Sequence, residues 1–111
     1  MIPAVRDLDE YRGDTWQAWG YILDDQVVPQ PVDLQTATIR VQVRKRKGGD
    51  ILLDITNGSG VTVDVDNQWH INALLDFQAG KHYWDFQVTD GAVVTTYYAG
   101  TFRLHDDVTR I

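Results

Sequence analysis

The chain has 111 residues, 43% of them hydrophobic, no cysteine and a formal net charge of −6. This length fits one domain with its own core, and the lack of cysteine excludes disulfides and thiolate chemistry and fits a reducing cytoplasm. The negative charge opposes binding to nucleic-acid phosphates. Because no apolar signal-peptide core and no run of about 18 apolar residues occurs, we expect neither secretion by a signal peptide nor a membrane span.

An arm and an aromatic strand are expected first. Residues 1–10 are mostly polar or charged and should form an N-terminal arm or a short edge strand, before a single domain over residues 11–111. Residues 15–23 follow as a strand rich in aromatics. Alternation gives it two apolar faces, with Trp16, Ala18, Gly20 and Ile22 on one and Gln17, Trp19, Tyr21 and Leu23 on the other. Such a strand is either central in a sandwich or has its outer face covered by another element.

The middle of the chain predicts a loop and then four strands. Two prolines assign residues 24–35 to a loop, because proline cannot donate to a strand ladder. Residues 38–45 alternate as a half-buried strand whose isoleucine and valines face inward. Further strands, separated by glycine-rich turns, are expected at residues 51–55, 61–65 and 68–72, and residues 73–77 are the only plausible helical turn.

The C-terminal part has the strongest local signal. Apolar and polar residues alternate over 84–89 up to Asp90-Gly91, a pair that tolerates the positive φ angles of a tight hairpin turn. Two more β-rich runs follow at residues 93–98 and 101–104, so we expect an antiparallel meander here. In total the sequence predicts an all-β fold, an antiparallel β-sandwich of about seven to eight strands.

No constellation of side chains suggests catalysis or metal binding. The histidines His70, His82 and His105 lie 12 and 23 residues apart on different predicted strands, so we expect ordinary half-exposed histidines. Acidic pairs such as Asp24-Asp25 are typical of solvated turns, and no serine or threonine has the surroundings of an activated nucleophile. We therefore expect no catalytic, metal-binding or cofactor-binding residue, and no enzymatic activity.

A basic run, Arg44-Lys45-Arg46-Lys47, precedes two glycines and is expected at a hairpin tip. Such a run can bind a nucleic acid or an acidic partner. On an acidic chain, however, we favour a solvated strand end that prevents pairing between sheet edges. The remaining functional interpretation is a salt-sensitive contact with an acidic neighbouring subunit.

The aromatic residues are more informative, because there are too many for one face of one small core. Where an adjacent pair such as Tyr97-Tyr98 lies in a regular strand, one member must point away from the interior. Outward aromatics commonly anchor interfaces, and they also stack on sugars. The interface candidates are Trp19, Tyr21, Tyr97 and Tyr98, together with Arg44, Lys45, Arg46 and Lys47.

Four groups of residues occur in a distinctive order. They are Tyr11-Arg12-Gly13-Asp14-Thr15, then Pro31-Val32-Asp33-Leu34 with residues 37–44, then residues 79–91, and finally Gly100-Thr101-Phe102 with Asp107-Val108-Thr109-Arg110. This succession looks like the small immunoglobulin-like domains of tailed-bacteriophage virion proteins, and is similar in particular to the N-terminal domain of the baseplate upper protein family. The chain departs from that family at Leu34-Gln35-Thr36-Ala37, where a leucine-threonine-glycine-alanine turn is usual.

The resemblance implies an immunoglobulin-like β-sandwich in a non-enzymatic virion structural protein. Such a protein would be made in the host bacterial cytoplasm and assemble in multiple copies in the tail, baseplate or fibre-attachment region. Its partners would be other virion proteins, with neither nucleic acid nor membrane involved. Two alternatives stay open: a capsid decoration protein, and a carbohydrate-binding adhesion module, which requires two or three aromatics in a platform beside Asp, Asn or Gln.

Overall fold

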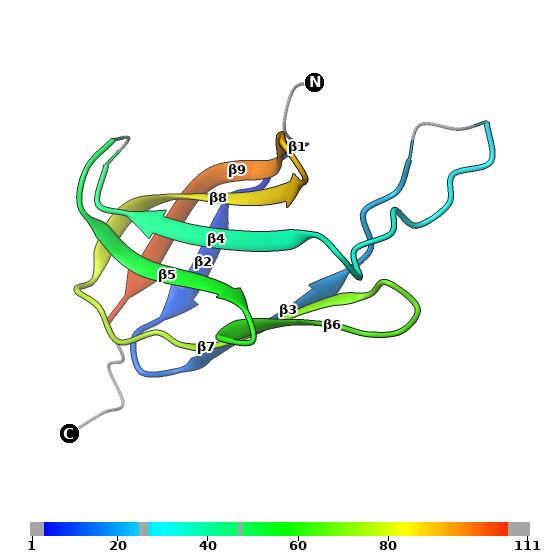
Figure 1. Ribbon diagram of the computed structural model, residues 1–111. Helices are drawn as coiled ribbons and strands as arrows, with labels where there is room; N and C mark the ends of the chain where they lie inside the picture. The colour runs from blue at the N-terminus through cyan, green and yellow to red at the C-terminus, as the bar shows by residue number, and fades with distance from the viewer. Residues whose placement is uncertain (1–3, 25–26, 47, 107–111) are drawn as a thin grey trace.

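The computed structural model describes residues 4–24, 27–46 and 48–106, and these residues form nine strands and no helix (Figure 1). The strands are β1 (Ala4–Val5), β2 (Leu8–Tyr11), β3 (Thr15–Gly20), β4 (Thr38–Arg44), β5 (Ile51–Asn57), β6 (Gly60–Val63), β7 (Trp69–Leu74), β8 (Gly80–Asp90) and β9 (Val93–His105). The prediction of an all-β fold is therefore confirmed. Within these residues, no helix offers the length and apolar character that a membrane crossing requires.

The strands predicted between residues 38 and 72 occur where the alternation put them, apart from small differences at their ends. The helical turn expected at residues 73–77 is wrong. Ala73 and Leu74 complete β7, and Ala73, Leu75 and Phe77 are all buried. Burial at every second residue is the pattern of an extended chain rather than of a helix.

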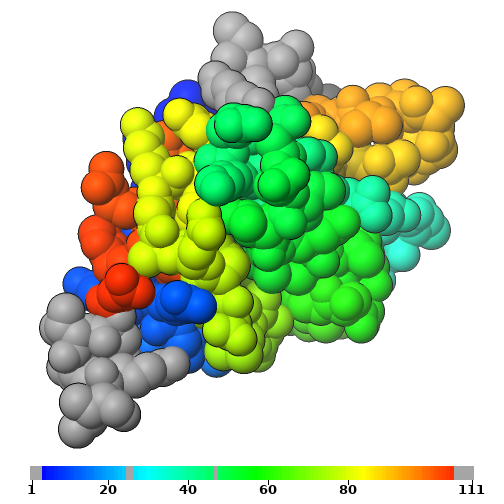
Figure 2. All heavy atoms as spheres, turned by 90° about the vertical axis from the view of Figure 1, so that its left-hand side faces the viewer, coloured from blue at the N-terminus to red at the C-terminus, as the bar shows by residue number. Residues whose placement is uncertain are grey.

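The nine described strands belong to one curled, mixed sheet. Along it they follow the order β1, β9, β8, β4, β5, β6, β7, β3, and β2 also pairs with β9. β1 and β2 run parallel to β9, with Ala4 opposite Tyr98 and Leu8 opposite Phe102, so residues 4–11 take the edge-strand form. Part of this order is visible at the surface in Figure 2, where β8 in yellow lies between β9 in orange and the β4–β5 region in green.

The hairpin predicted at Asp90-Gly91 is confirmed, since β8 and β9 pair antiparallel from Asp90 opposite Val93 onward and Gly91 has a φ of 61°. The expected meander is wrong, because β9 continues through Gly100 to His105 as one strand. Gly100 does not lie at a turn. A Cβ atom added there would overlap the carbonyl oxygen of Arg6, so glycine allows the link between β1 and β2 to approach β9 closely.

The core lies inside the curl of the sheet. Trp16 of β3 packs edge-on against Trp84 of β8 and Phe102 of β9, with ring centroids 5.9 and 5.2 Å away. Trp69 of β7 lies 4.9 Å from Phe86 of β8. β3 and β7 are thus packed across the core from β8 and β9. Aromatic pairs of this kind contribute about 0.5–1.5 kcal/mol each beyond their area burial.

β3 ends the sheet, since it pairs with β7 alone among the described strands. Of the two alternatives expected for residues 15–23, the central position in a sandwich is therefore wrong. The strand also ends at Gly20, and Leu23 makes only an isolated bridge with Pro31. Trp16 faces the core, whereas Trp19 on the opposite side is 68% exposed. The aromatic outer face of this segment consequently lies at an edge of the sheet.

Candidate functional site

The histidines do not form a common centre. In the described part of the chain, no group of three or more His, Cys, Asp or Glu residues is arranged to hold a metal ion. His82 was expected to be half-exposed, but only 2% of it is exposed, and its ring packs edge-on against Phe77. Each histidine Nε2 has its own partner within 2.9 Å: Asp64 for His70, the Gln78 carbonyl for His82 and Asp9 for His105.

Exposed aromatic and apolar side chains gather at the β3 edge. Trp19 lies opposite His70 of β7 in the antiparallel ladder, a position in which cross-strand Cβ atoms are about 4.5–5.5 Å apart. Tyr21 follows on the same outward side, and its Oη donates a hydrogen bond to Asp66 Oδ2 (2.8 Å). Leu23, two residues further, is 56% exposed. We call Trp19, Tyr21, Leu23, His70 and Asp66 the Trp19 surface.

Carboxylates border the rings of the Trp19 surface. His70 Nε2 donates a hydrogen bond to Asp64 Oδ2 at 2.8 Å. The hydrogen bond from Tyr21 lowers the pKa of Asp66 and in turn raises the pKa of Tyr21. Asp66 is therefore ionised at neutral pH and holds the Tyr21 hydroxyl group in place. The surface combines exposed ring area with hydrogen-bond acceptors.

Tyr97 and Tyr98 do not belong to the Trp19 surface. In β9, Thr96 pairs with Gln87 and Tyr98 with Phe86, so Tyr97 is the extra residue of a β-bulge. Both tyrosines are half-buried and pack against the core. The Tyr98 ring is also covered by the Arg6 guanidinium, 5.0 Å from its centroid. The bulge interrupts the strict alternation on which the prediction of an outward tyrosine depended.

The basic run is divided between two environments. Arg44 is half-buried, and its guanidinium donates hydrogen bonds to the Gly49 carbonyl (2.9 Å) and to Gln42 Oε1 (3.0 Å). Lys45 and Arg46 are exposed, and Lys47 lies outside the described residues. Arg44 therefore has a structural role at the end of β4, in addition to any contact with a partner.

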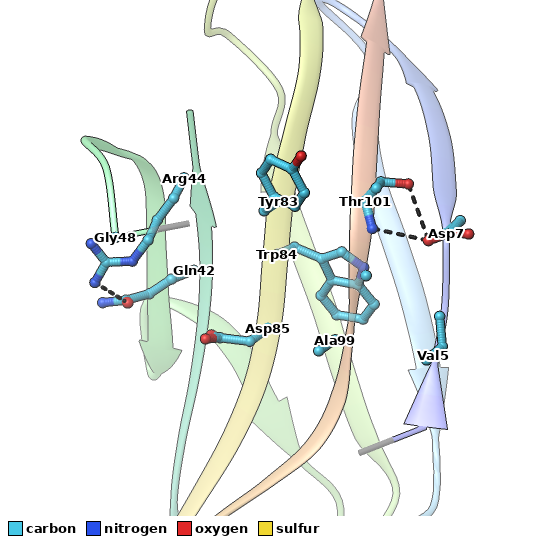
Figure 3. A pocket seen from close by; sticks show the side chains of 11 residues that line it. Val5, Asp7, Gln42, Arg44, Gly48, Tyr83, Trp84, Asp85, Ala99 and Thr101 are labelled. Atoms are coloured by element: carbon cyan, nitrogen blue, oxygen red, sulfur yellow. Dashed lines mark hydrogen bonds between the residues drawn. The ribbon is translucent and has the colours of Figure 1, made fainter. Parts of the chain in front are cut away.

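Arg44 also borders a groove of about 510 Å³ on the outer face of the sheet, which we call the β8 groove (Figure 3). β4, β8 and β9 form its floor, and β1 with the link to β2 forms one wall. In Figure 3, Tyr83 and Asp85 project from β8 between Arg44 and Gln42 on one side and Asp7 and Val5 on the other. The residues that line it are Val5, Asp7, Gln42, Arg44, Gly48, Tyr83, Trp84, Asp85, Ala99, Gly100 and Thr101.

The two carboxylates of the β8 groove differ in their surroundings. Asp7 accepts hydrogen bonds from the backbone N–H and the Oγ1 of Thr101, both at 3.0 Å, and these bonds lower its pKa. Asp85 is half-buried and accepts no hydrogen bond from the described residues. Burial raises the pKa of Asp85, although the nearby Arg44 guanidinium acts in the opposite direction. Among the residues that the structure describes, Asp85 is thus the carboxylate of the groove that accepts no hydrogen bond.

Sequence reasoning did not find the β8 groove, because its residues meet only through strand register. Gln42 of β4 lies opposite Asp85 of β8, and Asp85 in turn lies opposite Ala99 of β9. Alternation alone does place Gln42 and Asp85 on the outward faces of their own strands. The parallel pairing that brings Asp7 to Thr101 joins residues 94 positions apart and has no local signal.

No protein-family model matches this chain, and the search of curated proteins found no match either.

Proposed function

We propose that the protein is a non-enzymatic structural component of a tailed-bacteriophage virion, assembled in multiple copies in the tail, baseplate or fibre-attachment region. The order of motifs that resembles phage immunoglobulin-like domains supports the virion assignment. The observation that carries the assembly role is the exposure of Trp19 on an edge strand. Tryptophan and tyrosine at such positions are the residues that most often dominate protein–protein contacts.

The immunoglobulin-like arrangement is part of the same proposal. It is implied by the resemblance and is compatible with a curled sheet whose β3–β7 part packs on β8 and β9 through Trp16 and Trp69. In such a domain the Trp19 surface is available at one edge, where a neighbouring subunit can cover it. Contact with the partner would bury the ring area of Trp19 and Tyr21, while Asp64 and Asp66 would set its orientation through hydrogen bonds.

The test is substitution of the exposed tryptophan in a phage that encodes the protein. Trp19→Ala should reduce the amount of this protein in purified particles by roughly tenfold or more, because interface anchors cost about 2 kcal/mol or more when truncated. Tyr11→Ala is the matched control, since Tyr11 is an exposed aromatic of β2 that lies outside the Trp19 surface.

Quantitative mass spectrometry of particles gives the copy number, and soluble expression of each variant shows that it folds. Normal incorporation of the Trp19→Ala variant would eliminate the Trp19 surface as the contact. Absence of the unmodified protein from particles would overturn the virion assignment itself. Immunogold labelling distinguishes the tail from the head, where the same domain would be a capsid decoration protein.

A carbohydrate-binding adhesion module is the second candidate, favoured by the exposed ring of Trp19 on a surface where the carboxylates of Asp64 and Asp66 contact His70 and Tyr21. Exposed aromatic rings stack on sugars, and carboxylates accept hydrogen bonds from sugar hydroxyls. Under this function Trp19→Ala and Asp66→Asn would abolish binding to a host-glycan array but leave incorporation into particles unchanged. The same variant thus separates the two candidates.

A further inference from the structure

Asp85 lies in surroundings where a charged carboxylate requires a cation or a hydrogen-bond donor. It projects from the middle of β8 into the β8 groove, is half-buried, and forms no ion pair within the described residues. Removing a charged carboxylate from water is costly unless a cation or a hydrogen-bond donor compensates for it. Burial outweighs the attraction of Arg44 in setting the pKa of Asp85, so Arg44 compensates for this loss only in part.

Arg44 has its guanidinium directed to other acceptors. Its Nη1 and Nη2 atoms donate to the Gly49 carbonyl and to Gln42 Oε1. Figure 3 shows Arg44 and Gln42 together on one side of the groove, with Asp85 on the neighbouring strand. The groove therefore contains a carboxylate that can still accept hydrogen bonds from a ligand.

The remainder of the β8 groove suits an aliphatic or planar group. Val5 and Ala99 present apolar surface, and Tyr83 contributes an aromatic ring. A volume of about 510 Å³ exceeds what one water or ion requires and accommodates a long side chain. Arginine combines an aliphatic chain, a planar cation that stacks on aromatic rings, and donors that match a carboxylate in pairs.

We propose that the β8 groove binds an arginine side chain of a partner protein, with the guanidinium at Asp85 and the aliphatic part against Tyr83, Val5 and Ala99. A second copy of this chain is not the partner we infer, because a formal net charge of −6 on each chain opposes their association. The inference concerns the isolated protein and does not rest on the virion assignment. A negative result for arginine binding would therefore not affect the virion assignment, and a negative result for the virion assignment would not affect arginine binding.

The experiment is an NMR titration of the purified, ¹⁵N-labelled protein with N-acetyl-L-arginine methylamide. The matched probe is N-acetyl-L-citrulline methylamide, which has nearly the same shape without the charge. We expect saturable shifts of the Asp85, Ala99 and Thr101 amides with the arginine probe, and roughly tenfold weaker binding of the citrulline probe.

Two variants test whether the guanidinium of the arginine probe binds at Asp85. Asp85→Asn keeps the shape of the side chain and should weaken binding of the arginine probe roughly tenfold. Asp54→Asn is the control, because Asp54 lies on the same outer face of the sheet but outside the groove, and it should leave binding unchanged. A dispersed spectrum for each variant shows that it is folded.

Several outcomes would overturn the inference. They are equal binding of the citrulline probe, undiminished binding by Asp85→Asn, and absence of shifts at the groove. Saturation of the groove by acetate instead of the arginine probe would identify an anion site at Arg44. Equal affinity for N-acetyl-L-lysine methylamide would overturn the choice of arginine as the occupant.

Discussion

Asp85 stabilises the folded protein less at neutral pH than an uncharged residue of the same shape would. Its neutral form is favoured in the fold, because burial raises its pKa above the ordinary value of 3.8. A carboxyl group with a raised pKa destabilises the folded state above that pKa. This destabilisation decreases as the pH falls through the raised pKa toward the unfolded value, because the folded state takes up the proton first.

Asp85→Asn should therefore raise the melting temperature at pH 7, and its advantage should diminish as the pH approaches 4. Thermal unfolding followed by circular dichroism across this pH range measures both effects. Asp54→Asn should show no such gain, since Asp54 is exposed and forms an ion pair with Arg40 (3.2 Å) of the kind that contributes about 0–1 kcal/mol. A melting temperature of Asp85→Asn at or below that of the unmodified protein at pH 7 would contradict the argument.

At the scale of elements, hydrogen bonds hold the link between β1 and β2 against β8 and β9 at the N-terminal edge of the sheet. Trp84 Nε1 donates a hydrogen bond to the Arg6 carbonyl at 2.7 Å, and the Arg6 N–H donates to the Ala99 carbonyl at 2.9 Å. Asp7 adds its two hydrogen bonds from Thr101. The close approach behind these contacts depends on the missing side chain of Gly100.

The variant Gly100→Ala tests whether this close approach stabilises the folded protein. The added methyl group would overlap the Arg6 carbonyl, so the link must move and its hydrogen bonds weaken. We expect a loss of about 1–3 kcal/mol in the free energy of unfolding by urea, as for overpacked sites. Hydrogen exchange of the Thr101 amide, which donates to Asp7, should also accelerate.

The control is Ala99→Ser on the same strand, where the side chain borders the open β8 groove. It should change stability by no more than about 0.5 kcal/mol. Equal stability of the Gly100→Ala variant and the unmodified protein would show that the link between β1 and β2 does not need this glycine.

The same elements show what alternation can and cannot predict. β4 and β8 have one buried face and one face that is exposed or half-buried, so their period of two was sufficient to find them. β9 was divided in two because glycine is a turn signal in most sequences, whereas Gly100 is required for a contact with a residue far away in the chain. Trp19 was recognised as outward, but alternation does not decide which of Tyr97 and Tyr98 faces outward, because a bulge interrupts it there.

At the scale of the whole molecule, a single aromatic core joins the two parts of the curled sheet. Trp16, Trp69 and Trp84 are buried in it, whereas Trp19 is exposed. Unfolding should therefore be cooperative, and tryptophan fluorescence should report the core rather than the surface.

Trp19→Phe should retain most of the fluorescence change on unfolding, because the three buried tryptophans remain. The urea curves of this variant from fluorescence and from circular dichroism should coincide. Separate transitions would show that the β3–β7 part and the β8–β9 part unfold independently, against a single domain. Loss of most of the fluorescence change would contradict the assignment of Trp19 to the surface.

The parallel pairing of β1 and β2 with β9 also has a consequence for biosynthesis. During translation, residues 4–11 leave the ribosome long before Tyr98 to His105, so the first strands have no edge to join until β9 has emerged. Such a high contact order slows folding. β1 and β2 therefore lack their partner strand while residues 12–92 are synthesised, and this part of the sheet closes only after β9 has emerged.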